Sequence, residues 1–158
     1  MTFLIILIIV IVVILGVLVY LKFFKKKPKS IMERLEELEY YKQNKEFYDL
    51  QKKYMGEKGT DLDIMPEGIG EFGLDVTNPI PTSTLYGSNA YLGLLRTLDG
   101  VKIGYDRIGS TRAENIPYII DAYNITKNGE TIATLYICPY NKKTSEKAPK
   151  GFDLLKLF

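Results

Sequence analysis

The sequence predicts an α+β protein that combines one N-terminal transmembrane helix, a juxtamembrane helix and a small antiparallel β-rich domain built from two hairpins. The prediction comes from a 19-residue apolar run without charge, a helix-forming segment behind a capping box, and apolar stretches interrupted by Asp-Gly and Asn-Gly pairs. These features divide the 158 residues into an anchor with its basic flank at 1–29, the juxtamembrane helix at 30–56, and a small domain at 57–158.

The apolar run extends from Phe3 to Leu21 and consists almost entirely of Leu, Ile, Val and Phe. As a helix it is about 28 Å long, which matches the hydrocarbon core of a bilayer. A cleavable signal peptide requires a basic segment before the run and a small-residue cleavage site after it. Only two residues precede this run, and Tyr20, Phe23 and Phe24 form an aromatic belt at its end. The run therefore predicts an uncleaved signal anchor that crosses the membrane once.

Charge is distributed unevenly along the chain. The first 29 residues contain five lysines and no carboxylate, whereas the remainder carries 16 basic and 19 acidic side chains. Because positive flanks stay on the cytoplasmic side, we expect the N-terminus outside and the C-terminal domain in the cytoplasm, at the inner membrane. The same lysines are expected to attract anionic headgroups, which makes the lipid bilayer a partner. These membrane-surface residues are Lys22, Lys25, Lys26, Lys27 and Lys29.

The juxtamembrane helix is predicted over residues 31–55. Ser30 and Glu33 have the spacing of a capping box, and Gly56 supplies a stop signal. The segment lacks a sustained heptad, which disfavours a long coiled coil. One face carries large apolar residues at helical spacing, which predicts either self-association or partner binding through the 31–55 helix, or packing on the protein's own domain. Its members are Phe47, Leu50 and Tyr54, with Tyr48 beside them.

Residues 56–88 are rich in glycine and proline and predict irregular chain. Their G-x-G-x-x-G pattern at 68–73 has neither a strand before it nor a helix after it, so we expect no nucleotide site there. A first hairpin is predicted around Asp99-Gly100, between residues 94–98 and a return strand at 101–108. Residues 89–95 could equally form a short helical turn.

A second hairpin is predicted around Asn128-Gly129, joining residues 118–126 to residues 131–138. Centring the turn on that pair sets the register and thereby assigns one strand face to the core. The expected pairs are Lys127 with Glu130, Ile125 with Ile132, Tyr123 with Thr134, and Ile119 with Cys138. The expected core face carries Ile120, Ala122, Ala133, Leu135 and Ile137.

The composition excludes several function classes. The chain contains no histidine, which removes Ser-His-Asp and Cys-His catalysis and any imidazole zinc site. The mildly acidic part after residue 29 disfavours nucleic acid, whose binding is driven by basic surface. The single cysteine, Cys138, permits no internal disulfide and is expected to be buried and structural. No cofactor is expected, and no metal site, because the loop carboxylates lack EF-hand spacing. They are Asp61, Asp63, Glu67 and Glu71.

Binding residues are predicted where arginines alternate with tyrosines in the β-rich region. Such a set would form a pocket for an anionic group or a peptide carboxylate, although charged strand residues that face water explain the same pattern. Ser110 and Lys102 supply a serine–lysine pair, the one hydroxyl nucleophile arrangement that needs no imidazole. The predicted binding residues are Arg96, Tyr105, Arg107 and Arg112.

Together these features predict a single-pass membrane-anchored protein whose small cytoplasmic domain binds a protein partner or a small anionic ligand at the membrane. The missing histidine and the lack of a converging catalytic set favour a non-catalytic role, and no catalytic residue is assigned. Two alternatives stay open. One is a membrane-tethered hydrolase that uses Ser-Lys or paired carboxylates, and the other is a small host-interference or toxin-like membrane protein.

Overall fold

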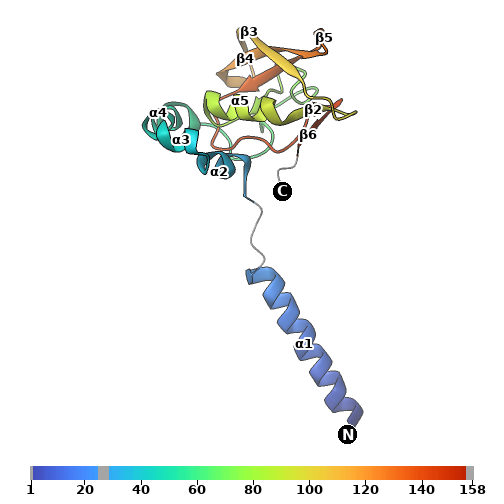
Figure 1. Ribbon diagram of the computed structural model, residues 1–158. Coiled ribbons are helices and arrows are strands. Elements are labelled where there is room, and N and C mark those ends of the chain that lie inside the picture. Colours follow the sequence, from blue (N-terminus) through green and yellow to red (C-terminus); the bar gives the residue numbers. More distant parts are fainter. Residues whose placement is uncertain (1, 25–28, 156–158) are drawn as a thin grey trace.

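The structure of the protein is a computed structural model that describes residues 2–24 and 29–155. Helix α1 (Thr2–Phe24) stands apart from a body in which a four-stranded sheet forms one layer and helix α5 (Thr84–Leu94) lies beneath it (Figure 1). The short helices α2 to α4 pack on α5 (Figure 1). A mixed α+β fold with a small sheet and several helices is therefore confirmed.

The apolar N-terminal run forms helix α1. Its side chains are described at positions 6, 7 and 9–20, all of which are exposed. Over the part of the chain that the structure describes, no helix combines the length and the apolar character that a bilayer crossing requires. The transmembrane anchor therefore stays a prediction.

The segment 31–56 is helical but is not the single helix that the sequence predicts. The capping box is present, since Ser30 Oγ accepts from the Glu33 amide at 3.2 Å and Glu33 Oε2 accepts from the Ser30 amide at 2.7 Å. The helix then breaks at Leu38 and again at Asn44. The resulting elements are α2 (Ile31–Glu36), α3 (Glu39–Gln43), α4 (Lys45–Gln51) and the π-helical turn η1 (Lys52–Gly56).

Tertiary packing of tyrosines accounts for these breaks. Tyr41 of α3 and Tyr48 of α4 are buried and stack with ring centroids 4.7 Å apart. Both rings also contact Tyr86 of α5, at 5.6 Å and 4.3 Å. Aromatic pairs of this kind add to the free energy of simple burial, so the chain bends to bring both tyrosines onto α5. Helix propensity alone is too weak to keep the segment straight.

The main sheet has the strand order β1-β5-β4-β3. The second predicted hairpin is confirmed as β4 (Ile116–Lys127) and β5 (Glu130–Cys138), joined at Asn128-Gly129 with positive φ at both turn residues. Strand β3 (Gly104–Ala113) pairs antiparallel with β4. Strand β1 (Ile80–Pro81) pairs parallel with β5, so the sheet is mixed and not purely antiparallel.

A β-bulge between Ile125 and Thr126 corrects the predicted register of this hairpin. Lys127 does pair with Glu130, but Ile125 lies opposite Ala133 and not opposite Ile132. The shift by one residue exchanges the two faces of β4, because side chains alternate along a strand. As a result Tyr123 and Ile125 share the core face with Ala133, Leu135 and Ile137, while the predicted members Ile120 and Ala122 lie on the opposite face.

The first predicted hairpin is present only next to its turn, where Arg96 and Lys102 form a single antiparallel bridge. The chain does turn at Asp99-Gly100, where the Thr97 amide donates to the Val101 carbonyl at 3.0 Å. Strand β2 (Leu95–Thr97), however, pairs antiparallel with β6 (Phe152–Leu154), and the chain after the turn joins β4 as strand β3. The C-terminal segment thus completes a second, two-stranded sheet.

Two apolar clusters hold the body together. The larger one lies between α5 and the sheet and includes Tyr91, Leu92 and Leu95 together with Leu135 and Ile137. The smaller one lies on the other side of β4 and β5. Its buried members are Met65, Ile116, Ile120 and Cys138. The larger cluster packs α5 against the sheet that contains β3. The exposed side of α5 therefore has a fixed position relative to β3.

Candidate functional site

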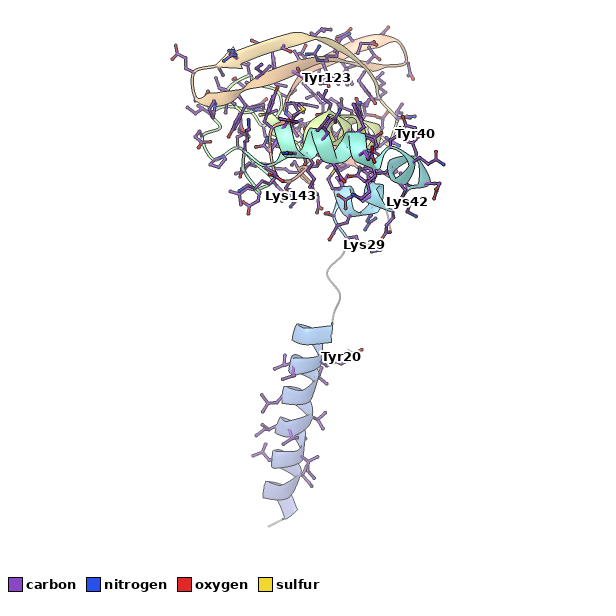
Figure 2. All side chains as sticks on the ribbon, turned by 90° about the vertical axis from the view of Figure 1, so that its left-hand side faces the viewer. Tyr20, Lys29, Tyr40, Lys42, Tyr123 and Lys143 are labelled. Carbon is purple, nitrogen blue, oxygen red and sulfur yellow. The ribbon has the colours of Figure 1, made fainter. Side chains whose placement is uncertain are left out.

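A shallow groove of about 490 Å³ lies between edge strand β3 and helix α5. We call it the β3–α5 groove. Its floor includes Tyr123 of β4, which lies between the sheet and the helices (Figure 2). Its walls come from elements far apart in the sequence. The lining residues are Leu85 and Asn89 of α5, Tyr105, Asp106 and Arg107 of β3, and Tyr123.

A β-bulge in strand β3 decides which side chains point toward this groove. Arg107 lies opposite Tyr123, and Ser110 lies opposite Asp121, so one extra residue of β3 is accommodated between them. In a regular strand, positions 107 and 110 would lie on opposite faces. The bulge brings both to the face that Tyr123 occupies, and Gly109 takes a positive φ of 152° within it.

Beside the groove, a buried carboxylate is held by two neighbours on β3. Asp121 is 3% exposed, and its Oδ1 accepts from Arg107 Nη2 at 2.8 Å and from Ser110 Oγ at 2.9 Å. The Arg107 side chain is about 50% exposed, so it compensates the buried charge while reaching solvent. The hydrogen bond to Asp121 and its charge raise the pKa of Arg107, which keeps the guanidinium positive.

Two tyrosines give the groove its aromatic character. The rings of Tyr105 and Tyr123 meet edge to face, with centroids 6.3 Å apart. Burial, and secondarily the charge of Asp121, raise the pKa of Tyr123 to about 12. The Tyr123 hydroxyl therefore stays protonated near neutrality and is available as a hydrogen-bond donor.

The outer edge of β3 is the second component of the site. Strand β3 ends the sheet. Eight of its ten residues pair with β4, on one side only, and the pairing is interrupted between Arg107 and Gly109 and between Thr111 and Ala113. Within residues 2–24 and 29–155, no further backbone hydrogen bond joins β3 to a loop or another strand. The opposite edge is the two-residue strand β1. Three residues near the start of this edge strand, Tyr105, Asp106 and Arg107, line the β3–α5 groove.

The structure brings together only two of the four predicted binding residues, Tyr105 and Arg107. Arg96 donates from Nη1 to the carbonyls of Gly93 and Leu95, at 2.9 and 2.7 Å, and so caps the end of α5. Arg112 is exposed farther along β3 and does not line the groove.

Of the predicted membrane-surface lysines, only one has a described side chain. Lys29 forms an ion pair with Glu37 of the α2–α3 connection. The side chains of Lys22, Lys25, Lys26 and Lys27 lie outside the described residues.

The residues that the catalytic alternatives would use do not come together at one site in the described part of the chain. Ser110 bonds to Asp121 and Arg107, and Lys102 is not among its hydrogen-bond partners. Burial raises the pKa of Cys138, which disfavours a thiolate. The carboxylate of Asp63 already accepts hydrogen bonds from Lys143 Nζ at 3.0 Å and from the Glu146 amide at 2.7 Å. Over the described residues no group of three metal-ligating side chains occurs.

Sequence reasoning missed Asp121, Tyr123, Leu85 and Asn89 as members of this site. For Asp121 a signal existed, because it is the one charge within the apolar run at 116–123. A charge at a core position needs a partner, which directs attention to a nearby arginine. The residues of α5 carried no such signal, since their placement depends on tertiary packing.

Comparison with models of known protein families, with curated proteins and with solved structures finds no match for this chain. Functional inference therefore depends on the β3 edge and the β3–α5 groove.

Proposed function

We propose that this chain is a non-catalytic, membrane-anchored binding protein whose body takes an extended segment of a protein partner along strand β3. The single observation that supports this most directly is the ten-residue free edge of β3 beside an aromatic groove. A segment that adds to a sheet edge gains main-chain hydrogen bonds, and neighbouring pockets read its side chains.

The groove favours a protein segment over a small anionic ligand. Arg107 is the cation that lines it, and the buried carboxylate of Asp121 already compensates that charge. Asp106 adds a second negative charge at the rim. The site therefore has no excess positive charge to attract a free anion. Tyr105, Tyr123 and the exposed Leu85 instead offer aromatic and apolar surface for a side chain of the partner.

The membrane location is part of the same proposal. Its support is the apolar sequence at 3–21, the helical conformation of α1, and the basic flank after it. On this basis the N-terminus lies outside and the body lies in the cytoplasm. Carbonate washing of membranes and protease protection of sealed vesicles test the two statements separately. Release by carbonate contradicts the anchor, and cleavage of the body from outside contradicts the orientation.

A peptide screen tests the binding proposal with the full chain in lipid nanodiscs. Random linear peptides displayed on phage are selected against it, and the best one is synthesised. We expect this peptide to slow amide hydrogen exchange in residues 104–113, because strand addition protects the outward amides. We also expect Asn89→Trp, which fills the groove from an exposed position, to weaken binding about tenfold or more.

The matched control is Ile132→Trp on β5, an exposed position outside the groove. Binding by this variant should be unchanged. If exchange in β3 does not slow, or if both tryptophan variants bind equally well, strand addition at this groove is wrong.

A further inference from the structure

Three large side chains lie exposed on one face of the continuous helical segment formed by α4 and η1. Phe47, Leu50 and Tyr54 are 58%, 54% and 61% exposed. Their spacing of three and four residues places them in one row, which we call the apolar stripe. Single exposed apolar residues are ordinary on protein surfaces, but an aromatic and aliphatic row on one helix face indicates a contact surface.

An adjoining face of this segment is already occupied, and the ring of Phe47 meets that of Tyr48 edge to face, with centroids 5.7 Å apart. Tyr48 of α4 is buried against Tyr41 and Tyr86, so α4 is fixed in its rotation about its own axis. The helix cannot turn to bury the apolar stripe in the protein's own core. The nearby Tyr40 of α3 is 63% exposed, and its ring centroid lies 6.5 Å from that of Tyr48. The stripe therefore faces away from the body.

Lysines interleave with the apolar stripe. Lys53 extends over the ring of Tyr54, with Nζ 5.9 Å from the ring centroid. Lys45 and Lys52 lie on the same helical segment and form ion pairs with Asp49 of α4 and Glu36 of α2, whereas Lys53 has no ion-pair partner among the described residues. Aromatic and aliphatic residues combined with lysines that extend their charge outward suit a boundary between hydrocarbon and anionic headgroups.

The tether restricts how far this segment can lie from the bilayer. Six residues lead from Phe24, the end of α1, to Ser30, the N-cap of α2. Even fully extended, that stretch reaches at most about 22 Å. With α1 in the membrane, as proposed above, Ser30 stays within this distance of its surface, and the ion pair of Lys52 in η1 with Glu36 of α2, at 3.4 Å, keeps the segment next to the helix that follows Ser30.

From the exposed row, its lysines and the short tether, we infer that the apolar stripe lies in the headgroup region of an anionic bilayer. This contact rests on the proposed anchor. It turns one defined side of the body toward the membrane, and it goes beyond the binding of a partner at β3. A second copy of the chain is the competing occupant, which the experiment distinguishes.

The experiment places a fluorophore on cysteine variants of the full chain and measures its quenching by spin-labelled lipids. Cys138 is the only cysteine and is buried, so an introduced surface cysteine is labelled selectively. Leu50→Cys reports the apolar stripe, Ile132→Cys reports a distant exposed position, and Val12→Cys reports α1. The vesicles contain phosphatidylcholine, with and without phosphatidylglycerol.

We expect the probe at position 50 to be quenched severalfold more strongly than the probe at position 132, and more strongly when phosphatidylglycerol is present. Adding Phe47→Asp and Tyr54→Asp should abolish this excess, since both side chains are more than half exposed and the charge opposes entry into the bilayer. Equal quenching at positions 50 and 132 overturns the inference. So does energy transfer between differently labelled copies at position 50 without lipid quenching, because it assigns the stripe to a second copy.

The remaining probe separates this inference from the proposed function. Quenching at position 12 reports whether α1 enters the lipid, and peptide binding at β3 is measured independently. If the probe at position 50 shows no excess quenching while the probe at position 12 is quenched and the peptide binds, only the inference about the apolar stripe is wrong. The proposed function is then unaffected.

Discussion

Removing the Arg107 side chain is the sharpest test of how the β3–α5 groove is built. In Arg107→Ala the carboxylate of Asp121, which is 3% exposed, loses its ion-pair partner and keeps the hydroxyl of Ser110. A hydrogen bond to a charged group contributes about 1.5–3 kcal/mol. Since the Arg107 side chain is about 50% exposed, water and salt screen part of that energy. We therefore expect Arg107→Ala to lower the free energy of unfolding by about 1–2 kcal/mol.

Urea denaturation of the full chain in nanodiscs, followed by tyrosine fluorescence, measures this loss. Arg112→Ala is the matched control on the same strand, because Arg112 is exposed and outside the groove, and it should cost less than about 0.5 kcal/mol. The double variant Arg107→Ala with Asp121→Asn should recover part of the loss, since no buried charge is left unpaired. Equal losses for the two arginine variants, or no recovery in the double variant, would refute the ion pair as a stabilising element.

Three further predictions concern other parts of the body. Because the pKa of Tyr123 rises from 10.0 to about 12, its neutral form stabilises the fold below pH 10, and this contribution should be lost between pH 10 and 12. Tyr123→Phe should flatten that decline in alkaline urea titrations. Tyr91→Phe removes a partly buried hydrogen bond of 2.6 Å to the Lys147 carbonyl and should cost about 1 kcal/mol in the same assay. Ser30→Ala removes the capping box and should speed hydrogen exchange in residues 31–36, without affecting exchange in β4.

Local signals predicted the hairpin of β4 and β5 well. Asn128-Gly129 provides the positive φ values that the turn requires, and these depend on two neighbouring residues only. The bulge at Ile125 had no comparable signal. Its position depends on which face of β4 packs against α5, and that packing places Tyr123 and Ile125 in the larger apolar cluster.

The candidate site also has one part that the local sequence predicts and another that depends on tertiary packing. The pattern of arginines and tyrosines included Tyr105 and Arg107, which the structure places in one groove, but it grouped them with Arg96, which caps α5 instead. Which arginine reaches the groove depends on the bulge in β3, where Gly109 permits the backbone to turn Arg107 and Ser110 to one face.

By itself the sequence determined the features that depend on near neighbours: an α+β chain with an apolar N-terminal helix, a capped helical segment and a tight hairpin, and the absence of histidine chemistry. Tertiary structure alone decided the rest. It broke the 31–55 segment around buried tyrosines, paired β2 with the distant β6, and left β3 as a free edge beside α5. The physical reason is that these outcomes depend on side chains brought together from distant positions, whose burial outweighs the modest preferences of the local chain.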